Sequence, residues 1–274
     1  MPSFNQQIID EFRANAGVVG GPFEGARLLL LTTTGARTGA KHTTPLAYLP
    51  DDAERVLVIG SAGGSDKHPA WYHNLVADPE VVVETGLFTY EAKAVVLTGT
   101  ERDQAFARAV EAEPGWAAYQ ARTSRVIPVV ALTQAGGGPP HADSFGDLLV
   151  RIHTAFRREL ALIRREIADS GGSGPGLGAQ LRINCLTFCQ GLHHHHAGED
   201  RGIFPMLADR FPELDPVLRR LSEEHEKVAT LVEELQRVIA EGGGDLLGEV
   251  DRLVEALDAH LSYEEEQLVP FLDR

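Results

Sequence analysis

The sequence predicts a two-part fold: a strand-rich α+β domain of the small-barrel type, followed by an all-α four-helix bundle. In the first half, short runs of Val, Leu, Ile and Thr are interrupted by Gly, Asp and Pro, as is typical of strands. In the second half, apolar residues recur every three or four positions over four long segments, as in amphipathic helices. Between the halves, residues 134–141 read Gln-Ala-Gly-Gly-Gly-Pro-Pro-His, a composition typical of a linker.

We therefore expect a barrel domain over residues 1–134, a linker over 135–142 and a bundle over 143–274. A chain of 274 residues is long enough to give each domain its own hydrophobic core. The strands are expected at 27–34, 43–49, 55–61, 81–84 and 126–132. Helices are expected in the same half at 4–16, 69–77 and 101–113.

The four bundle helices follow from continuous apolar stripes. These stripes run from Leu149 to Ile167, from Leu181 to Glu199, from Leu218 to Ile239 and from Leu246 to Leu268. The segments between them, 169–178, 211–216 and 241–244, are rich in Gly or Pro. Short connections of this kind favour antiparallel packing of neighbouring helices.

Ionisable residues occupy core positions of these stripes. The spacing His-x3-Glu-x5-Pro occurs twice, beginning at His195 and at His260, and places a histidine and a carboxylate one helical turn apart on one face. The inward-facing residues are His153, His195, Glu199, His225, His260 and Glu264. Burying an unpaired polar group costs about 2–7 kcal/mol, and more for a charge, so we expect cations to compensate all six together. Mixed imidazole and carboxylate ligands suit iron, manganese or zinc, and two carboxylates that can bridge favour two ions.

The alternative is a solvated histidine patch with buried His–Glu hydrogen bonds. We prefer it for His193 and His194, since a helix cannot aim four consecutive side chains at one point, and we leave His196 undecided. Cys185 and Cys189 lie four residues apart in an apolar helical run, and we expect small core residues rather than a redox pair.

The charge distribution excludes several classes of partner. The net charge is −15; residues 1–134 contain 11 Lys and Arg against 15 Asp and Glu, and the remainder contains 14 against 25. This acidity argues against nucleic acid and against an anionic membrane surface. No apolar run approaches the roughly 20 residues of a membrane span, and the N-terminus does not resemble a signal peptide. We expect a cytoplasmic protein.

The helical half resembles the hemerythrin-like HHE cation-binding domain over roughly residues 143–273. The resemblance rests on His153 with the following 156–160, on 195–200 with Phe204-Pro205, on Glu224-His225 and on 260–265. It implies a non-haem di-iron site with an open position for dioxygen, peroxide or nitric oxide. Muscle-type hemerythrins place a further histidine where this chain has Ala229, so we expect one iron to be more open. Sensing or turnover of these small molecules is then at least as well supported as oxygen carriage.

Two glycine-containing loops in the barrel half are suited to an anion. Residues 32–46 join two expected strands and carry Arg37 and Lys41, which supply positive charge for a phosphate. Residues 60–64 follow a strand and lead toward the helix at 69–77, where backbone N–H groups can hold an anion. An ordinary glycine hairpin with exposed basic residues is the alternative for the first loop.

Residues 4–132 resemble the deazaflavin-dependent nitroreductase family, through the two loops together with residues 11–15, Gly20-Gly21, 116–120 and 127–129. The resemblance implies a split β-barrel that binds the reduced deazaflavin coenzyme F420 and transfers hydride to a quinone or nitroaromatic. The implied coenzyme-binding residues are Arg37, Lys41, Pro45, Ser61, Gly63, Gly64, Trp71 and Asn74. The implied acceptor-side residues are Trp116 and Tyr119, with Ser61 or Tyr119 able to hydrogen-bond the developing oxyanion.

Three departures from that family reduce the fixed positive charge: Ala36, His42 and Ala62. We expect weaker coenzyme binding, with FMN as the alternative cofactor. The whole chain is interpreted as a two-module redox enzyme. The second hypothesis is a di-iron sensor or gas-binding protein with a catalytically degenerate barrel. A homodimer is considered as the assembly.

Overall fold

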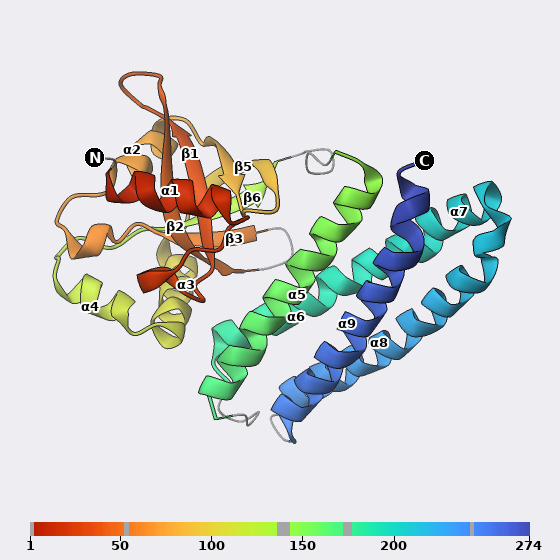
Figure 1. The fold of residues 1–274 in the computed structure, drawn as a ribbon. Helices are drawn as coiled ribbons and strands as arrows, with labels where there is room; N and C mark the ends of the chain where they lie inside the picture. Colours follow the sequence, from red (N-terminus) through yellow and green to blue (C-terminus); the bar gives the residue numbers. More distant parts are fainter. Residues whose placement is uncertain (1–2, 52–54, 136–142, 172–176, 242–243) are drawn as a thin grey trace. The chain divides into compact units, whose positions relative to one another are not determined.

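The computed structural model describes residues 3–51, 55–135, 143–171, 177–241 and 244–274. The chain forms two compact units that divide near residue 141, one built on a barrel and one built on long helices (Figure 1). Of the expected linker, residues 136–142 lie outside the described part, so the proposed domain boundaries stay a prediction.

The first unit is a closed antiparallel barrel with the strand order β1-β2-β3-β6-β5-β4. The strands are β1 (Leu28–Thr34), β2 (Lys41–Pro50), β3 (Arg55–Ile59), β4 (Glu80–Glu84), β5 (Thr89–Val96) and β6 (Val129–Gln134). The helices of this unit are α1 (Phe4–Ala14), α2 (Ala70–Ala77), α3 (Gly99–Ala112) and α4 (Gly115–Ala121), with short 3-10 turns η1 (Gly21–Phe23) and η2 (Ala62–Gly64). This fold confirms the barrel expectation.

Two of these elements were not expected from the sequence. Strand β5 alternates buried small residues, Ala92 and Ala94, with exposed Glu91 and Lys93, and alanine carries little strand signal. Pairing with β4 on one side and β6 on the other determines its conformation. Helix α4 has seven residues, too few for a helical period to show in the sequence.

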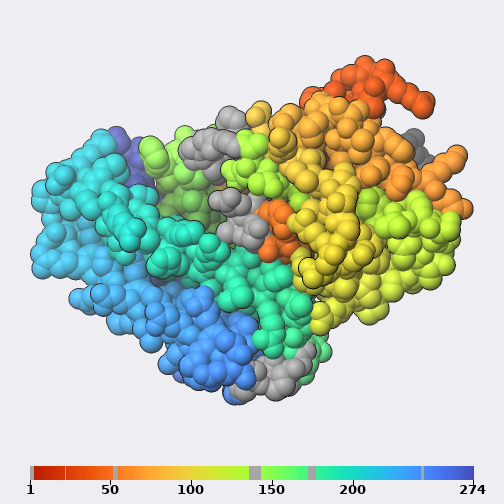
Figure 2. Space-filling view, turned by 180° about the vertical axis from the view of Figure 1, so that it is seen from behind, coloured from red at the N-terminus to blue at the C-terminus, as the bar shows by residue number. Residues whose placement is uncertain are grey.

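The barrel interior is a continuous apolar core. Leu29, Leu31, Val83, Val130 and Leu132 are almost completely buried there. Each such side chain contributes about 1.5–3 kcal/mol when it leaves water. The hairpin between β1 and β2 extends beyond this core, and its tip projects from the unit in both views (Figures 1 and 2).

The second unit consists of α5 (Phe145–Asp169), α6 (Ala179–Gly198), α7 (Phe204–Arg210), α8 (Asp215–Glu241) and α9 (Leu246–Leu272). A π-helical turn, η4 (Glu199–Ile203), connects α6 to α7, and a 3-10 turn, η5 (Pro212–Leu214), precedes α8. Figure 2 shows α6 and α7 in teal and cyan beside α8 in blue. The four long helices confirm the expected bundle.

Apolar stripes of the long helices form the core of this unit. Ile163, Ile167, Leu192, Leu235 and Leu253 are among its most deeply buried members. A second apolar cluster around Phe204, Leu221 and Leu268 lies toward the other end of the helices. Cys185 and Cys189 are buried in this core, as expected for core residues. No described helix is long and apolar enough to cross a membrane.

Candidate metal centre and coenzyme hollow

Two clusters of potential metal ligands lie side by side in the interior of the helical unit. One comprises His153, His195, Glu199 and Glu264, and the other comprises His196, His225 and His260. Within each cluster, one ligand atom from every residue lies within 4.8 Å of those of the others. The residues come from α5, α6 with its π-helical extension, α8 and α9, so every long helix contributes.

The two carboxylates connect the clusters. Glu199 places Oε1 3.2 Å from His195 Nε2 and Oε2 3.6 Å from His225 Nε2. Glu264 places Oε2 3.6 Å from the Nε2 atoms of both His153 and His260. Donor atoms bound at about 2.1 Å to one cation, at angles of about 90–110°, lie about 3.0–3.4 Å apart. The arrangement therefore has the dimensions of two cation positions bridged by two carboxylates.

Three further carboxylates lie against the imidazoles, two of them in hydrogen bonds and Asp200 in an ion-pair contact. His153 Nδ1 lies 2.9 Å from Glu265, His260 Nδ1 lies 3.1 Å from Glu224, and His225 Nδ1 lies 3.1 Å from Asp200. With Nδ1 directed at a carboxylate, Nε2 of each ring is left for the centre. Carboxylate–histidine–metal arrangements of this kind orient the ring and increase its basicity as a ligand.

These orienting carboxylates are themselves held in place. Arg157 donates to Glu265 at 2.6 Å and Arg220 Nε donates to Glu224 at 2.8 Å. Ser222 Oγ donates to Asp200 at 2.9 Å. Their contacts were not expected from the sequence, although Asp200, Glu224 and Glu265 are each adjacent in sequence to an expected ligand. Each one serves a histidine on a different helix, which no local sequence pattern reveals.

The centre is enclosed and its polar atoms are unsatisfied. Both carboxylate oxygens of Glu199 and of Glu264, and Nε2 of His225 and His260, are buried without a hydrogen-bond partner among the described residues. Orphaned buried polar atoms of this kind are costly and rare in native proteins. Cations placed between them would satisfy all of these atoms, so the donor set fits a metal pair.

Burial also changes the protonation of these groups. It lowers the pKa of His153 and of His195 to about 3 and that of His260 to about 4, so these imidazoles are neutral at physiological pH. Burial raises the pKa of Glu199 and Glu264 above the usual carboxyl range, because two carboxylates without cations are poorly solvated there. Neutral imidazole is the form that binds metal, and a bound cation would favour the ionised carboxylates.

A break in helix geometry coincides with one bridging carboxylate. The π-helical turn η4 begins at Glu199, directly after α6 ends, and Pro205 follows in the first turn of α7. Proline has no N–H to continue the α-helical hydrogen-bond ladder, and single π-helical turns are frequent at functional sites. His195 and Glu199 share a helix face through their four-residue spacing, and the chain leaves α-helical geometry directly at Glu199.

All six expected ligands are thus brought together, although no metal is shown to bind them. His193 and His194 are exposed, in keeping with the solvated interpretation. His196, left undecided by the sequence, lies in the second cluster with 6% of its surface exposed. Tyr263 is half-buried near the centre, with the Arg220 guanidinium 3.6 Å from its ring centroid.

In the barrel unit, a hollow of about 610 Å³ lies between the β1–β2 hairpin and α2. Of the expected coenzyme-binding residues, it contains Arg37, Trp71 and Asn74. Asn74 also holds the hairpin in place, because its Nδ2 donates to Thr33 Oγ1 at 3.0 Å and its Oδ1 accepts from Ala36 N at 3.1 Å. Lys41 and Pro45 are on β2 and do not line this hollow.

The other expected residues lie around the loop after β3. Gly64 has φ +83°, and a Cβ there would come 2.9 Å from Tyr119 O, so glycine is required at this position. The loop with Ser61 and Gly63 therefore lies against α4, whose Trp116 and Tyr119 rings meet edge to face at 6.0 Å. The expected coenzyme-side and acceptor-side residues are thus divided between two places, the hollow beside α2 and the loop beside α4, rather than lying in one pocket.

Arg125 holds the loop after β3 and was not identified from the sequence. It donates to the carbonyl oxygens of Gly60, Ser61 and Ser65 at 2.7–3.0 Å. It also lies 3.2 Å from His68 Nδ1, and burial, together with the Arg125 charge, lowers the pKa of His68. A single arginine in an irregular segment carries no sequence signal for such long-range contacts.

Comparison with known families agrees with both units. Residues 5–134 match the family F420H(2)-dependent quinone reductase, and residues 145–272 match the hemerythrin HHE cation-binding domain. The chain joins an F420H2-dependent quinone reductase domain to a hemerythrin HHE domain. The reductase domain therefore belongs to an oxidoreductase family, as expected from the sequence.

Individual relatives match the reductase domain. The F420H(2)-dependent quinone reductase Rv1261c of Mycobacterium tuberculosis is 38% identical over 127 residues, which cover 45% of this chain and 85% of that protein. A putative F420H(2)-dependent quinone reductase from the same organism, Rv3178, is 34% identical over 104 residues, covering 38% and 87% of the two chains. A solved F420-H2 dependent reductase, FDR-A, is 39% identical and covers 39% of this chain and 93% of that one, with a TM-score of 0.36.

Proposed function

We propose that the HHE domain, over residues 143–274, holds two iron ions between its two ligand clusters. The main support is that Glu199 and Glu264 each lie within 3.6 Å of one histidine in the first cluster and one histidine in the second. When bound, iron would supply one-electron redox chemistry and an open position for dioxygen, peroxide or nitric oxide; manganese or zinc are the alternatives. The chain's own residues supply the ligands, fix the ring orientations and keep bulk water from the centre.

Metal analysis tests this proposal most directly. Full-length protein purified without an affinity metal should contain about two iron ions per chain, with visible absorption that changes on exposure to oxygen, peroxide or nitric oxide. His225→Ala should lower the metal content, whereas His194→Ala, an exposed position in the histidine run, should not. Full-length protein that folds but takes up neither iron, manganese nor zinc would refute the proposal.

We propose that the reductase domain, over residues 1–134, transfers hydride from reduced F420 to a quinone or nitro-type acceptor. The hollow would take the coenzyme, with the Arg37 guanidinium binding its phosphate and Trp71 and Asn74 positioning the ring. Other proposed contacts lie outside the hollow and would touch parts of the coenzyme that extend beyond it: Lys41 and Pro45 on β2, and Ser61, Gly63 and Gly64 in the loop after β3. Trp116 and Tyr119 would face the acceptor, with the Tyr119 or Ser61 hydroxyl donating a hydrogen bond to the developing oxyanion.

Coenzyme oxidation provides the test. Purified protein should oxidise reduced F420 when menadione is added, and Arg37→Ala should raise the KM for the coenzyme by roughly tenfold, the value of one charge-assisted contact at a partly exposed site. Lys93→Ala is the matched control, because Lys93 is an exposed cation on β5 outside the hollow. No turnover with F420 or FMN at any coenzyme concentration would refute the proposal.

A second function, a di-iron sensor with a catalytically degenerate reductase domain, is favoured by one observation. Among the described residues that line the hollow, Arg37 alone carries a fixed positive charge. The family resemblance implies basic residues where this chain has Ala36 and His42. A spectral response of the iron to oxygen, peroxide or nitric oxide in protein that shows no coenzyme turnover would support this alternative.

A further inference from the structure

His196 is a buried imidazole without a partner for Nε2. Its side chain is 6% exposed, and its Nε2 has no hydrogen-bond partner among the described residues. The ring stacks on His225 at 4.1 Å between centroids with an interplanar angle of 10°, and it meets His260 edge to face at 5.2 Å. Two exposed histidines precede His195 and His196 in the same run, so burial of His196 is not a property of the run as a whole.

Helix geometry explains how two consecutive histidines can both serve the centre. Successive residues of an α-helix point about 100° apart, so His195 and His196 cannot face the same atom. His195 Nε2 lies 3.1 Å from His153 Nε2 on α5, whereas His196 lies against His225 on α8 and His260 on α9. The two rings therefore address the two different cation positions.

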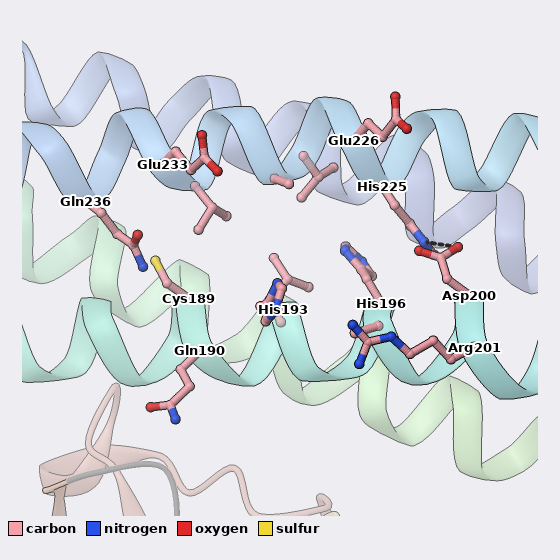
Figure 3. Close-up of a pocket in the computed structure, with 15 residues that line it drawn as sticks. Cys189, Gln190, His193, His196, Asp200, Arg201, His225, Glu226, Glu233 and Gln236 are labelled. Atoms are coloured by element: carbon pink, nitrogen blue, oxygen red, sulfur yellow. Dashed lines mark ion pairs between the residues drawn. The ribbon is translucent and has the colours of Figure 1, made fainter.

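Helix α8, which faces His196, has an alanine at the position one turn after His225, where a further ligand could lie. Ala229 follows His225 by one turn and shares its face, but a methyl group cannot bind a metal. A cavity of about 560 Å³ lies between α6 and α8, lined by His196, His225 and Ala229 among others (Figure 3). In Figure 3 the His196 and His225 rings point toward one another from the two helices.

We propose that His196 is the third imidazole ligand of the cation position formed by His225 and His260, in the place of a ligand that α8 lacks at Ala229. This inference rests on the proposed metal centre and adds a residue to it. The position then has three imidazoles and two bridging carboxylates, whereas the position of His153 and His195 has two imidazoles and the same carboxylates. The open site for a small ligand is accordingly on the His153–His195 side, and Ala229 does not create it.

Three variants of the full-length protein test this assignment. His196→Ala should bind one metal ion with affinity at least roughly 100-fold weaker and retain the other. Loss of a residue that only hydrogen-bonds a ligand reduces affinity by about 10- to 100-fold. His193→Ala is the matched control, because it removes an exposed imidazole from the same run and the same cavity rim. The double variant His196→Ala/Ala229→His moves the imidazole to α8, where the cavity provides room, and should restore the lost binding step.

The readout is anaerobic titration of metal-free protein with Co²⁺, followed by ligand-field absorbance, with circular dichroism as the measure of folding. Two binding steps in the wild type and in His193→Ala, one weakened step in His196→Ala and rescue by Ala229→His would support the assignment. Two unchanged steps in His196→Ala would overturn it while leaving the metal centre intact. A wild type without any binding step would instead refute the proposed function.

Discussion

The contact between Glu265 and His153 permits a sharp test of how the centre is held. Glu265 Oε1 lies 2.9 Å from His153 Nδ1 and also accepts from Arg157 at 2.6 Å. Glu265→Gln keeps the size of the side chain but removes the negative charge that orients the ring and increases its basicity. We expect weaker metal binding at the His153–His195 position only.

The magnitude follows from the burial of the pair. Loss of a carboxylate that supports a histidine ligand reduces metal affinity by about 10- to 100-fold. The Glu265 side chain is 24% exposed, so solvent screens part of its charge and the lower half of that range applies. The expected loss is about 10- to 30-fold, or roughly 1.4–2 kcal/mol at 25 °C.

Competition between the metal-free protein and a chelator for Co²⁺ measures this loss for each binding step. One step should weaken in Glu265→Gln, while the step that belongs to His225 and His260 should change less than about twofold. Glu266→Gln is the matched control, since it removes one charge from the next residue of α9 at an exposed position. Equal affinities in Glu265→Gln and wild type, or an equal loss in Glu266→Gln, would refute the orienting role.

Three other predictions follow from the same contacts. Removal of the metals at neutral pH should lower the midpoint of helical unfolding by roughly 10–20 °C in calorimetry, because two metal ions, each present at about 100 times its Kd, stabilise by about 2.7 kcal/mol each. An unchanged midpoint would exclude tight binding. Arg125→Met should raise the KM for the reduced coenzyme by roughly tenfold with a smaller change in kcat, because the loop with Ser61 loses the hydrogen bonds that Arg125 donates to it. Lys93→Met should behave as wild type. Burial raises the pKa of the Cys189 thiol to about 12 from 9.0, which lowers the fraction of reactive thiolate. Alkylation of Cys189, followed by mass spectrometry, should therefore be about 1,000-fold slower in the native protein than in urea. Equal rates would contradict its buried placement.

The sequence predicted which ionisable side chains gather inside the helical unit better than it predicted the arrangement of the barrel loops, for a physical reason. A helix repeats its face every three or four residues, so His195, Glu199, His260 and Glu264 could be assigned to the core from spacing alone. The orienting carboxylates could not, because Glu224 serves His260 and Asp200 serves His225 across helix boundaries. His196 was ambiguous for the same reason. The spacing of residues on α6 does not reveal that α8 and α9 pack against the side of the helix that carries His196.

In the reductase domain, the loops that carry the expected site residues are positioned by contacts distant in sequence. The hairpin that carries Arg37 is tied to α2 by Asn74, 38 residues from the Ala36 amide that it accepts from. The loop with Ser61 is held by Arg125, 64 residues away. Such contacts have no local periodicity, so the sequence predicted the residue types around an anion but not their division between two neighbourhoods. Strand β5 was missed because its buried face is alanine, which only the pairing with β4 and β6 makes strand-like.

The activities proposed for the two domains differ in the number of electrons that they would move. A deazaflavin resembles a nicotinamide in transferring a hydride, two electrons with one proton, to an acceptor that the protein positions and shields from water. Two iron ions would change state one electron at a time, and Glu199 and Glu264, each within 3.6 Å of a histidine from both clusters, would hold them as a pair. Direct transfer from coenzyme to iron would require the hydride to be split. Hydride transfer in one domain beside small-molecule chemistry in the other requires no such step, so independent action of the two domains is the simpler expectation.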